Sequence, residues 1–127
     1  MQFYEKGQPI YLQIADYVCE RVLQNTWEPG RKIPSVRELA VQLAVNPNTV
    51  MRTYDFLKQL GVIYDKRGIG YFVTDDAIEK ARIYLKEDFM NRELPILFRS
   101  MYLLGLEPED LKSDFNFYKQ QYNENKQ

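Results

Sequence analysis

The sequence contains no histidine and only one cysteine, Cys19. One cysteine cannot form a disulfide within the chain, and the usual Cys/His metal sites are excluded within one chain. No run approaches the roughly 18 apolar residues of a membrane span, and the N-terminus lacks the basic start and apolar run of a signal peptide. We therefore expect a cytoplasmic protein with no metal, no other cofactor and no membrane partner.

A large excess of positive charge is also missing, since the net charge is −1. The charge is unevenly distributed, however. Residues 31–74 carry seven basic and three acidic side chains, a net of +4, whereas residues 76–127 carry eight basic and ten acidic ones, a net of −2. This asymmetry is typical of a local DNA-binding surface, although charge alone fits scattered surface residues equally well.

The first helix is predicted to begin at Pro9, whose missing N–H is no loss in a first turn. It should end near Thr26, before the turn at residues 28–30. Apolar residues recur within it at spacings of three and four, which gives a single inward stripe. That stripe consists of Ile14, Ala15, Val18, Val22 and Leu23.

Two further helices follow, joined by a very short connection. Ser35 and Glu38 have the spacing of a capping box at the start of one helix. Asn46 as N-cap and Pro47 in the first turn begin the other. Only residues 44–45 lie between them, and so short a link forces a sharp crossing, as in a helix-turn-helix.

A basic β-hairpin is predicted after these helices. Residues 62–64 and 71–73 are rich in β-branched and aromatic side chains, and residues 65–70 between them contain two glycines. The fold class is therefore mainly α with a small β-hairpin (α+β). We interpret residues 1–75 as a winged helix-turn-helix DNA-binding domain.

The rest of the chain, residues 76–127, is predicted to be a helical dimerisation tail of two helices. Pro95 should kink or break the long helical stretch over residues 76–103 near Leu94. A last helix should begin at residues 107–110, where acids favour a helix N-terminus. Two helices cannot bury both faces alone, so we expect a homodimer. The predicted dimer contacts are Leu85, Phe89, Leu97, Phe98, Met101, Tyr102 and Phe115.

DNA contacts are expected from three places in a winged helix. The recognition helix enters the major groove by its N-terminal end, where short hydrogen-bonding residues and arginine suit base edges. The preceding helix and the wing reach phosphates or the minor groove. The predicted DNA-binding residues are Lys32, Ser35, Arg37, Asn46, Pro47, Asn48, Thr49, Arg52, Lys66, Arg67, Gly68 and Gly70.

Most of these residues also have a purely structural explanation. Asn46 is first of all a helix cap, and the wing glycines are turn residues. Tyr54 is more often a core residue than a base-stacking one. Arg52 could pair with Asp55 or Glu38 at the surface, a contact of little energetic value. Only the joint arrangement of the basic and amide groups on one predicted face favours DNA.

Other function classes remain open at this point. A winged helix that recognises a protein would bind with an affinity insensitive to salt, unlike a phosphate-binding surface. An enzyme is disfavoured, because no nucleophile lies beside a base and residues 68–70 are too short for a dinucleotide fingerprint. A small-molecule effector could bind at the dimer seam or in the aromatic tail, but plain hydrophobic packing is the favoured explanation there.

Several motifs resemble the N-terminal domain of GntR-type regulators, with a match over about residues 9–74. They are PIYLQI at 9–14, PGRKIPSVRELA at 29–40, VNPNTVMRTY at 45–54, LGVI at 60–63 and GIGYFV at 68–73. The VNPNTV run, the short tail and LGLEPEDL at 104–111 resemble the YtrA subfamily. Many relatives outside that subfamily have arginines where this chain has Pro47 and Met51, so their DNA contacts do not transfer unchanged.

The resemblance carries its own expectations. Such proteins are bacterial repressors, often of transporter operons, that bind palindromes as dimers. It implies that Arg37 of the PSVRELA motif and Arg52 contact DNA, together with the residues that open the recognition helix. It also implies that Gly68 or Gly70 approaches the minor groove. The tail of about 52 residues is short for a separate effector domain of that family.

Overall fold

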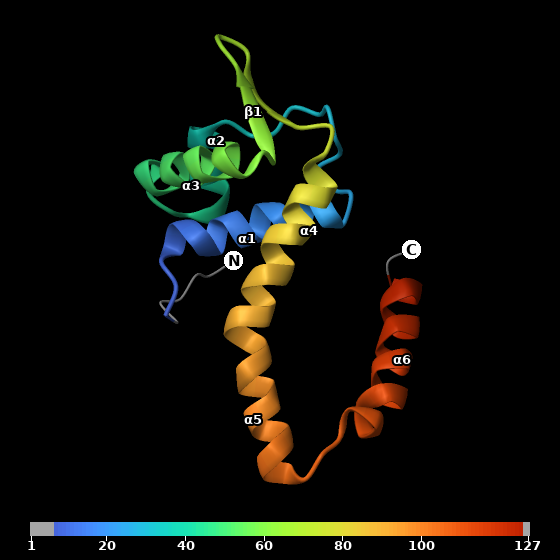
Figure 1. The fold of residues 1–127 in the computed structure, drawn as a ribbon. Helices are drawn as coiled ribbons and strands as arrows, with labels where there is room; N and C mark the ends of the chain where they lie inside the picture. The colour runs from blue at the N-terminus through green and yellow to red at the C-terminus, as the bar shows by residue number, and fades with distance from the viewer. Residues whose placement is uncertain (1–6, 126–127) are drawn as a thin grey trace. The chain divides into compact units, whose positions relative to one another are not determined.

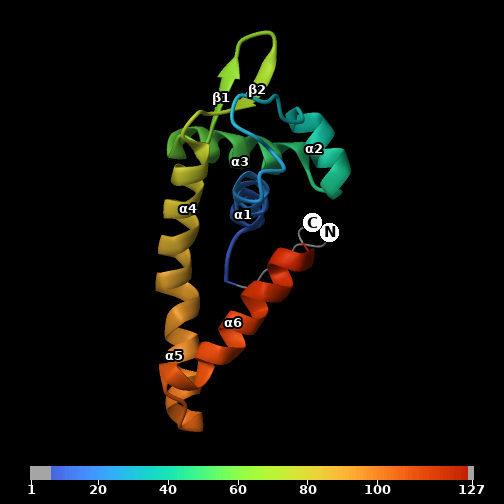
Figure 2. The same ribbon diagram turned by 90° about the vertical axis from the view of Figure 1, so that its right-hand side faces the viewer.

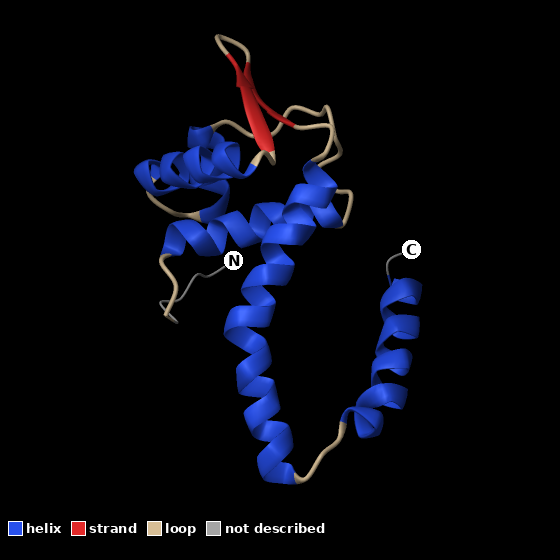
Figure 3. Cartoon of the chain, viewed as in Figure 1, coloured by secondary structure: helices blue, strands red, loops and turns tan. Residues whose placement is uncertain are grey.

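The structure is a computed structural model, and it describes residues 7–125. The chain divides into two compact units, Met1–Glu87 and Asp88–Gln127, which we call the first and the second unit. Helices make up most of both, and the two-stranded antiparallel sheet β1–β2 lies in the first (Figure 3). The predicted fold class, mainly α with a small hairpin, is confirmed. None of the described helices is both long and apolar enough to span a bilayer.

Three helices form the body of the first unit (Figure 1): α1 (Ile10–Leu23), α2 (Val36–Leu43) and α3 (Pro47–Leu60). The two predicted helix starts are confirmed by their caps. The Ser35 Oγ accepts from the Glu38 N–H at 3.1 Å, and the Ser35 N–H donates to a Glu38 carboxylate oxygen at 2.9 Å. The Asn46 Oδ1 accepts from the Asn48 N–H at 2.8 Å. Helix α1 ends earlier than the predicted Thr26.

The core of the first unit is built from the apolar faces of these helices, with contributions from the hairpin and α4. Tyr54 is fully buried, and its hydroxyl donates to the Pro34 carbonyl at 2.6 Å, so the prediction that it is a core residue is confirmed. Cys19 is also fully buried. Burial, and then the nearby Asp16 and Glu20, raises the pKa of its thiol to about 12.

The hairpin consists of β1 (Ile63–Lys66) and β2 (Gly70–Val73). Its register pairs Ile63 with Val73 and Lys66 with Gly70, which leaves a short basic tip. The loop before α2 joins the other edge of β2, where Lys32 forms an antiparallel bridge with Phe72. Figure 2 shows this loop running beside the hairpin. The sequence pattern did not predict that third strand-like segment.

Helix α4 (Ala77–Asp88) begins within the first unit rather than in a separate tail. Ala77 and Ala81 are fully buried in its core, and Leu85 packs against that core. The division between compact units therefore follows Glu87, twelve residues beyond the predicted boundary at 75/76, because the first turns of α4 complete the core.

The second unit holds a π-helical turn, η1 (Phe89–Glu93), then α5 (Leu94–Leu104) and α6 (Pro108–Asn125). The predicted disturbance near Leu94 therefore takes the form of a π turn. Pro95 lacks an N–H, and its ring would clash with the carbonyl of the preceding turn in a regular α-helix, so the helix widens there. A bidentate pair between Arg92 and Asp88, at 2.8 and 2.9 Å, spans the turn.

Candidate nucleic-acid interface

The N-terminal end of α3 presents unused hydrogen-bonding groups to the outside. Asn46, Pro47 and Asn48 are exposed, and Thr49 is half-buried. Capping occupies the side-chain carbonyl oxygen of Asn46, which leaves its amide NH₂ as a donor. Amide and hydroxyl groups at the first turn of a helix are the groups that read base edges in a major groove. The structure therefore brings these four predicted residues together on one helix end.

Arg52 lies on the side of α3 opposite the buried stripe and is exposed. In the described part of the chain it forms an ion pair with neither Asp55 nor Glu38. Its guanidinium carbon instead lies 3.9 Å from the centre of the Tyr11 ring, a cation–π contact with the start of α1. The structure thus gives the predicted surface arginine a partner that local sequence spacing did not suggest.

The start of α2 offers a second set of groups. Ser35 and Arg37 are both exposed. Ser35 uses its hydroxyl oxygen as the cap acceptor, so its hydroxyl hydrogen stays available to a phosphate. The Glu38 carboxylate accepts from the Ser35 N–H, and this hydrogen bond is the main cause that lowers the pKa of Glu38. Arg37 is therefore the exposed basic side chain of this helix start.

The wing has a basic tip on an aromatic base. Arg67 and Gly68 are exposed at the tip, and Gly68 has a φ of +80° that favours glycine. The Lys66 ammonium lies 4.8 Å from the centre of the Phe72 ring, and Phe72 stacks on Tyr64 at 5.7 Å. These contacts stiffen the hairpin and leave its basic groups at the surface.

Lys32 belongs to the wing rather than to α2. Its Cε lies 2.8 Å from the place that a Cβ on Gly70 would occupy, and Gly70 has a φ of +143°. The lysine stem therefore crosses Gly70 at the start of β2. Close by, Lys58 of α3 forms a 3.0 Å ion pair with Asp65 of β1, which ties the recognition helix to the wing.

The start of α1 adjoins the start of α3, a proximity that sequence reasoning missed. A shallow depression of about 400 Å³ lies between them. It is lined by Pro9, Ile10, Tyr11, Asn48, Thr49 and Arg52. Tyr11 is thus part of the surface that carries three predicted DNA-binding residues. Within the described residues there is no group of His, Cys, Asp and Glu that would hold a metal ion.

The predicted dimer contacts divide into five exposed side chains and two that are buried or half-buried. Phe89, Leu97, Phe98, Tyr102 and Phe115 of the second unit are exposed, Tyr102 at 87%. Met101 is only 7% exposed, and Leu85 is half-buried against the first unit's core. Those two side chains are therefore already engaged within one chain.

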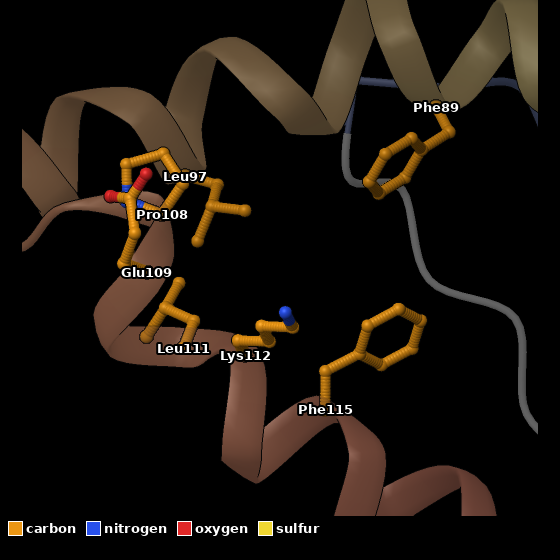
Figure 4. A pocket seen from close by; sticks show the side chains of 7 residues that line it. All are labelled: Phe89, Leu97, Pro108, Glu109, Leu111, Lys112 and Phe115. Atoms are coloured by element: carbon orange, nitrogen blue, oxygen red, sulfur yellow. The ribbon is translucent and has the colours of Figure 1, made fainter.

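Within the second unit, an apolar groove of about 660 Å³ lies between η1 and α5 on one side and α6 on the other (Figure 4). Phe89 and Leu97 face it from η1 and α5, and Leu111 and Phe115 face it from the start of α6. Lys112 and Glu109 are the charged residues at its lining. Three predicted dimer contacts thus line one apolar surface.

Comparison with known proteins places the first unit in a family. The profile of bacterial regulatory proteins of the gntR family matches residues 10–73. The HTH-type transcriptional regulator YhcF of Bacillus subtilis is 41% identical, over 85% of this chain and 88% of its own. The HTH-type transcriptional repressor YtrA of the same organism is 36% identical, over 81% of this chain and 78% of its own.

Solved structures give the same result. A putative GntR-family regulator from Bacteroides thetaiotaomicron has a TM-score of 0.70 and 41% identity, and the match covers 90% of this chain and 99% of that one. YtrA from Sulfolobus acidocaldarius, a GntR-family transcription factor, has a TM-score of 0.55 and 29% identity, with 97% and 99% coverage.

Similar structures also include complexes with DNA. AraR(DBD) in complex with operator ORX1 has a TM-score of 0.52 and 28% identity, with 58% of this chain and 89% of that one covered. YhcF and the Bacteroides thetaiotaomicron protein are both named as transcriptional regulators, which confirms the prediction of a regulator rather than an enzyme.

Proposed function

The chain belongs to the gntR family of bacterial regulatory proteins, on its YtrA-like branch, and from this premise we propose that it binds double-stranded DNA sequence-specifically and represses transcription as a homodimer. The observation that carries the proposal is the N-terminal end of α3, where the capping residue Asn46 keeps a free NH₂ donor and lies exposed with Asn48. The same unit also carries an exposed basic wing tip.

Base reading is assigned to α3. The Asn48 amide matches the donor and acceptor pattern of adenine, and Arg52 matches the two acceptors of guanine. The free NH₂ of Asn46 can donate to a base acceptor. Thr49 is suited to a thymine methyl or a base edge. Pro47 fixes the first turn of α3 without an N–H of its own. The specificity of the protein therefore resides in about two turns of one helix.

Phosphate contacts are assigned to the flanks of that helix. Arg37 and the Ser35 hydroxyl face one backbone from α2, while Lys32, Lys66 and Arg67 approach another from the wing. Such contacts position a protein on the duplex and supply most of its salt-dependent affinity. The space beside Gly68 is open, so the wing backbone can come close to the groove there. At Gly70 that space holds the Lys32 stem, so the lysine and this glycine approach the DNA together.

Dimerisation is assigned to the second unit, where large apolar side chains are exposed along α5 and α6. A twofold dimer carries two recognition helices and reads a palindrome whose half-sites lie about 34 Å apart or a multiple of that. Occlusion of a promoter by such a dimer is the simplest mechanism of repression, and the relative YtrA is named a repressor. On the family resemblance alone, we expect the regulated genes to encode a transporter. A protein that binds chromosomal DNA acts in the bacterial cytoplasm, where we expect this one to be.

Selection of bound duplexes from a random DNA pool tests the proposal most directly, because it gives half-site, spacing and symmetry together. The expected result is an inverted repeat. Affinity for the selected duplex is then measured by fluorescence anisotropy at two salt concentrations. Phosphate binding predicts a steep linear fall of log K with log salt. Recovery of no enriched sequence, or affinity insensitive to salt, would favour a winged helix that recognises a protein.

A further inference from the structure

Tyr11 is the second residue of α1, forty-one positions before the arginine that it contacts. Its backbone is fixed to α3 by a hydrogen bond, since the buried Thr53 hydroxyl donates to the Tyr11 carbonyl oxygen at 2.8 Å. Its ring meets Phe56 of α3 edge-on, with 6.2 Å between centres and 88° between planes. Both backbone and ring of Tyr11 are therefore held against the recognition helix.

One face of this fixed ring carries the Arg52 guanidinium at 3.9 Å. Tyr11 and Arg52 also line the same depression as Asn48 and Thr49, the residues to which base reading is assigned. Phe56 in turn packs edge-on to Tyr84 of α4 at 5.4 Å. The Arg52 guanidinium thus stacks on Tyr11, whose ring contacts Phe56. Phe56 and Tyr84 in turn pack against the core of the first unit.

We propose that Tyr11 is a positioning residue for Arg52, which it holds in the orientation needed to read a base; this inference rests on the proposed function. An exposed arginine samples many rotamers and loses them on binding. A guanidinium already stacked on a rigid ring loses fewer, and its planar fork stays aligned. The contribution of Tyr11 is therefore to discrimination between sequences rather than to attraction toward phosphates.

The test compares two substitutions in the full-length protein. Tyr11→Leu removes the aromatic face and keeps apolar bulk, whereas Tyr11→Phe keeps the face and removes only the hydroxyl. The probes are the duplex recovered by selection and a random-sequence duplex of equal length. Tyr11→Leu is expected to weaken binding to the selected duplex about 5–30-fold. Its affinity for the random duplex should change by less than about twofold, and Tyr11→Phe should retain both affinities.

A double-mutant cycle separates positioning from a structural role. In an Arg52→Ala background, Tyr11→Leu is expected to cause no further loss beyond about twofold, because the group that it orients is gone. Equal loss in both backgrounds would mean that Tyr11 acts on the fold, and loss on both duplexes with Tyr11→Phe would mean that the hydroxyl contacts a phosphate. Either result overturns the proposal.

A measurement without DNA keeps the inference distinct from the proposed function. In the free protein, NMR should show the Arg52 side-chain protons shifted upfield by the ring current, in the unmodified chain and in Tyr11→Phe. The shift should vanish in Tyr11→Leu, and its absence from the unmodified chain would overturn the positioning role. If Tyr11→Leu does not fold, Tyr11→Met takes its place, since it also removes the aromatic face and keeps apolar bulk. Unchanged affinity of that variant for the selected duplex would count against the proposal. If selection recovers no duplex, the proposed function fails, whatever the NMR result.

Discussion

The two units of the chain place their apolar side chains in opposite ways. In the first unit most large apolar residues lie in one core shared by three helices, the hairpin and α4. Among the described residues of the second unit, Met101 alone is buried, and aromatic rings along α6 stand in the open. A monomeric protein surface rarely leaves so many large apolar groups uncovered. The first unit is thus complete in one chain, whereas the second lacks a surface to pack against.

The same contrast appears in the polar groups. At two helix starts of the first unit, the side-chain oxygens of Ser35 and Asn46 each accept one capping hydrogen bond. The hydroxyl hydrogen of Ser35 and the NH₂ group of Asn46 remain as donors at the surface. Among the residues that the structure describes, the charged side chains that line the apolar groove of the second unit are Glu109 and Lys112. Exposed hydrogen-bonding groups suited to a polar ligand and an exposed apolar groove therefore lie in different units.

The largest expected effect comes from a cavity in the first unit. Leu57→Ala should lower the free energy of unfolding by about 2–5 kcal/mol, because Leu57 is fully buried. Leu104→Ala, at an exposed position of α5, should change it by less than about 0.5 kcal/mol. Urea unfolding monitored through the alkylation of Cys19 reports on the first unit alone. The thiol reacts only after that unit opens, since it is buried and its pKa is raised to about 12. Similar midpoints for both variants would remove the contrast between the units.

The next effect concerns the apolar groove of the second unit. Replacing Leu97 and Phe115 together by aspartate should weaken dimerisation by about 2–4 kcal/mol, since both line the groove and charges there would be buried against a partner. Sedimentation equilibrium at tens of micromolar should change from dimer to monomer. Val41→Asp is the matched control, because Val41 is an 81% exposed apolar residue of the first unit. A monomeric unmodified chain would reject this interface altogether.

How much was predictable from sequence depends on the range of the interaction. The capping box of Ser35 and the Asn46–Pro47 start are local patterns with one geometric solution, and the structure has both. The bridge of Lys32 to β2 joins residues 40 positions apart, and the stack of Arg52 on Tyr11 joins residues 41 apart. Periodicity carries no information about such pairs.

The second unit shows a different limit of sequence reasoning. Pro95 predicted a disturbance near Leu94, but the choice between a break, a kink and a π turn depends on what the flanking turns can accommodate. The sequence predicts the boundary at 75/76, where the helical stretch over residues 76–103 begins. Inward positions such as Ala81 show which face of that helix is buried, but not whether it packs on the first core or on another helix. In the structure Ala77 and Ala81 are fully buried in the first core.

A third prediction sharpens the assignment of DNA reading to the first unit. Arg52→Ala should reduce affinity for the selected duplex by about 1–3 kcal/mol and relax specificity at one base pair, whereas Arg67→Ala should weaken all duplexes alike and lower the salt slope by about one. Arg99→Ala in the second unit should leave affinity unchanged. Anisotropy titrations on selected and random duplexes check all three. Unchanged affinity of Arg52→Ala would remove Arg52 from the site.

The smallest expected effect is the pH dependence of the α2 cap. The hydrogen bond from the Ser35 N–H holds the pKa of Glu38 below its ordinary value in the folded state. Its contribution to stability is therefore fully present above the unfolded pKa and is lost as the pH falls through the lower folded pKa. The effect is small because Glu38 is exposed.

Glu38→Gln keeps an acceptor at the same position but cannot titrate in this range. The urea midpoint of the unmodified chain relative to Glu38→Gln should therefore be higher at pH 6 than at pH 3. If the difference between the two proteins is the same at both pH values, the capping carboxylate makes no ionisation-dependent contribution, and the first unit owes its stability to packing.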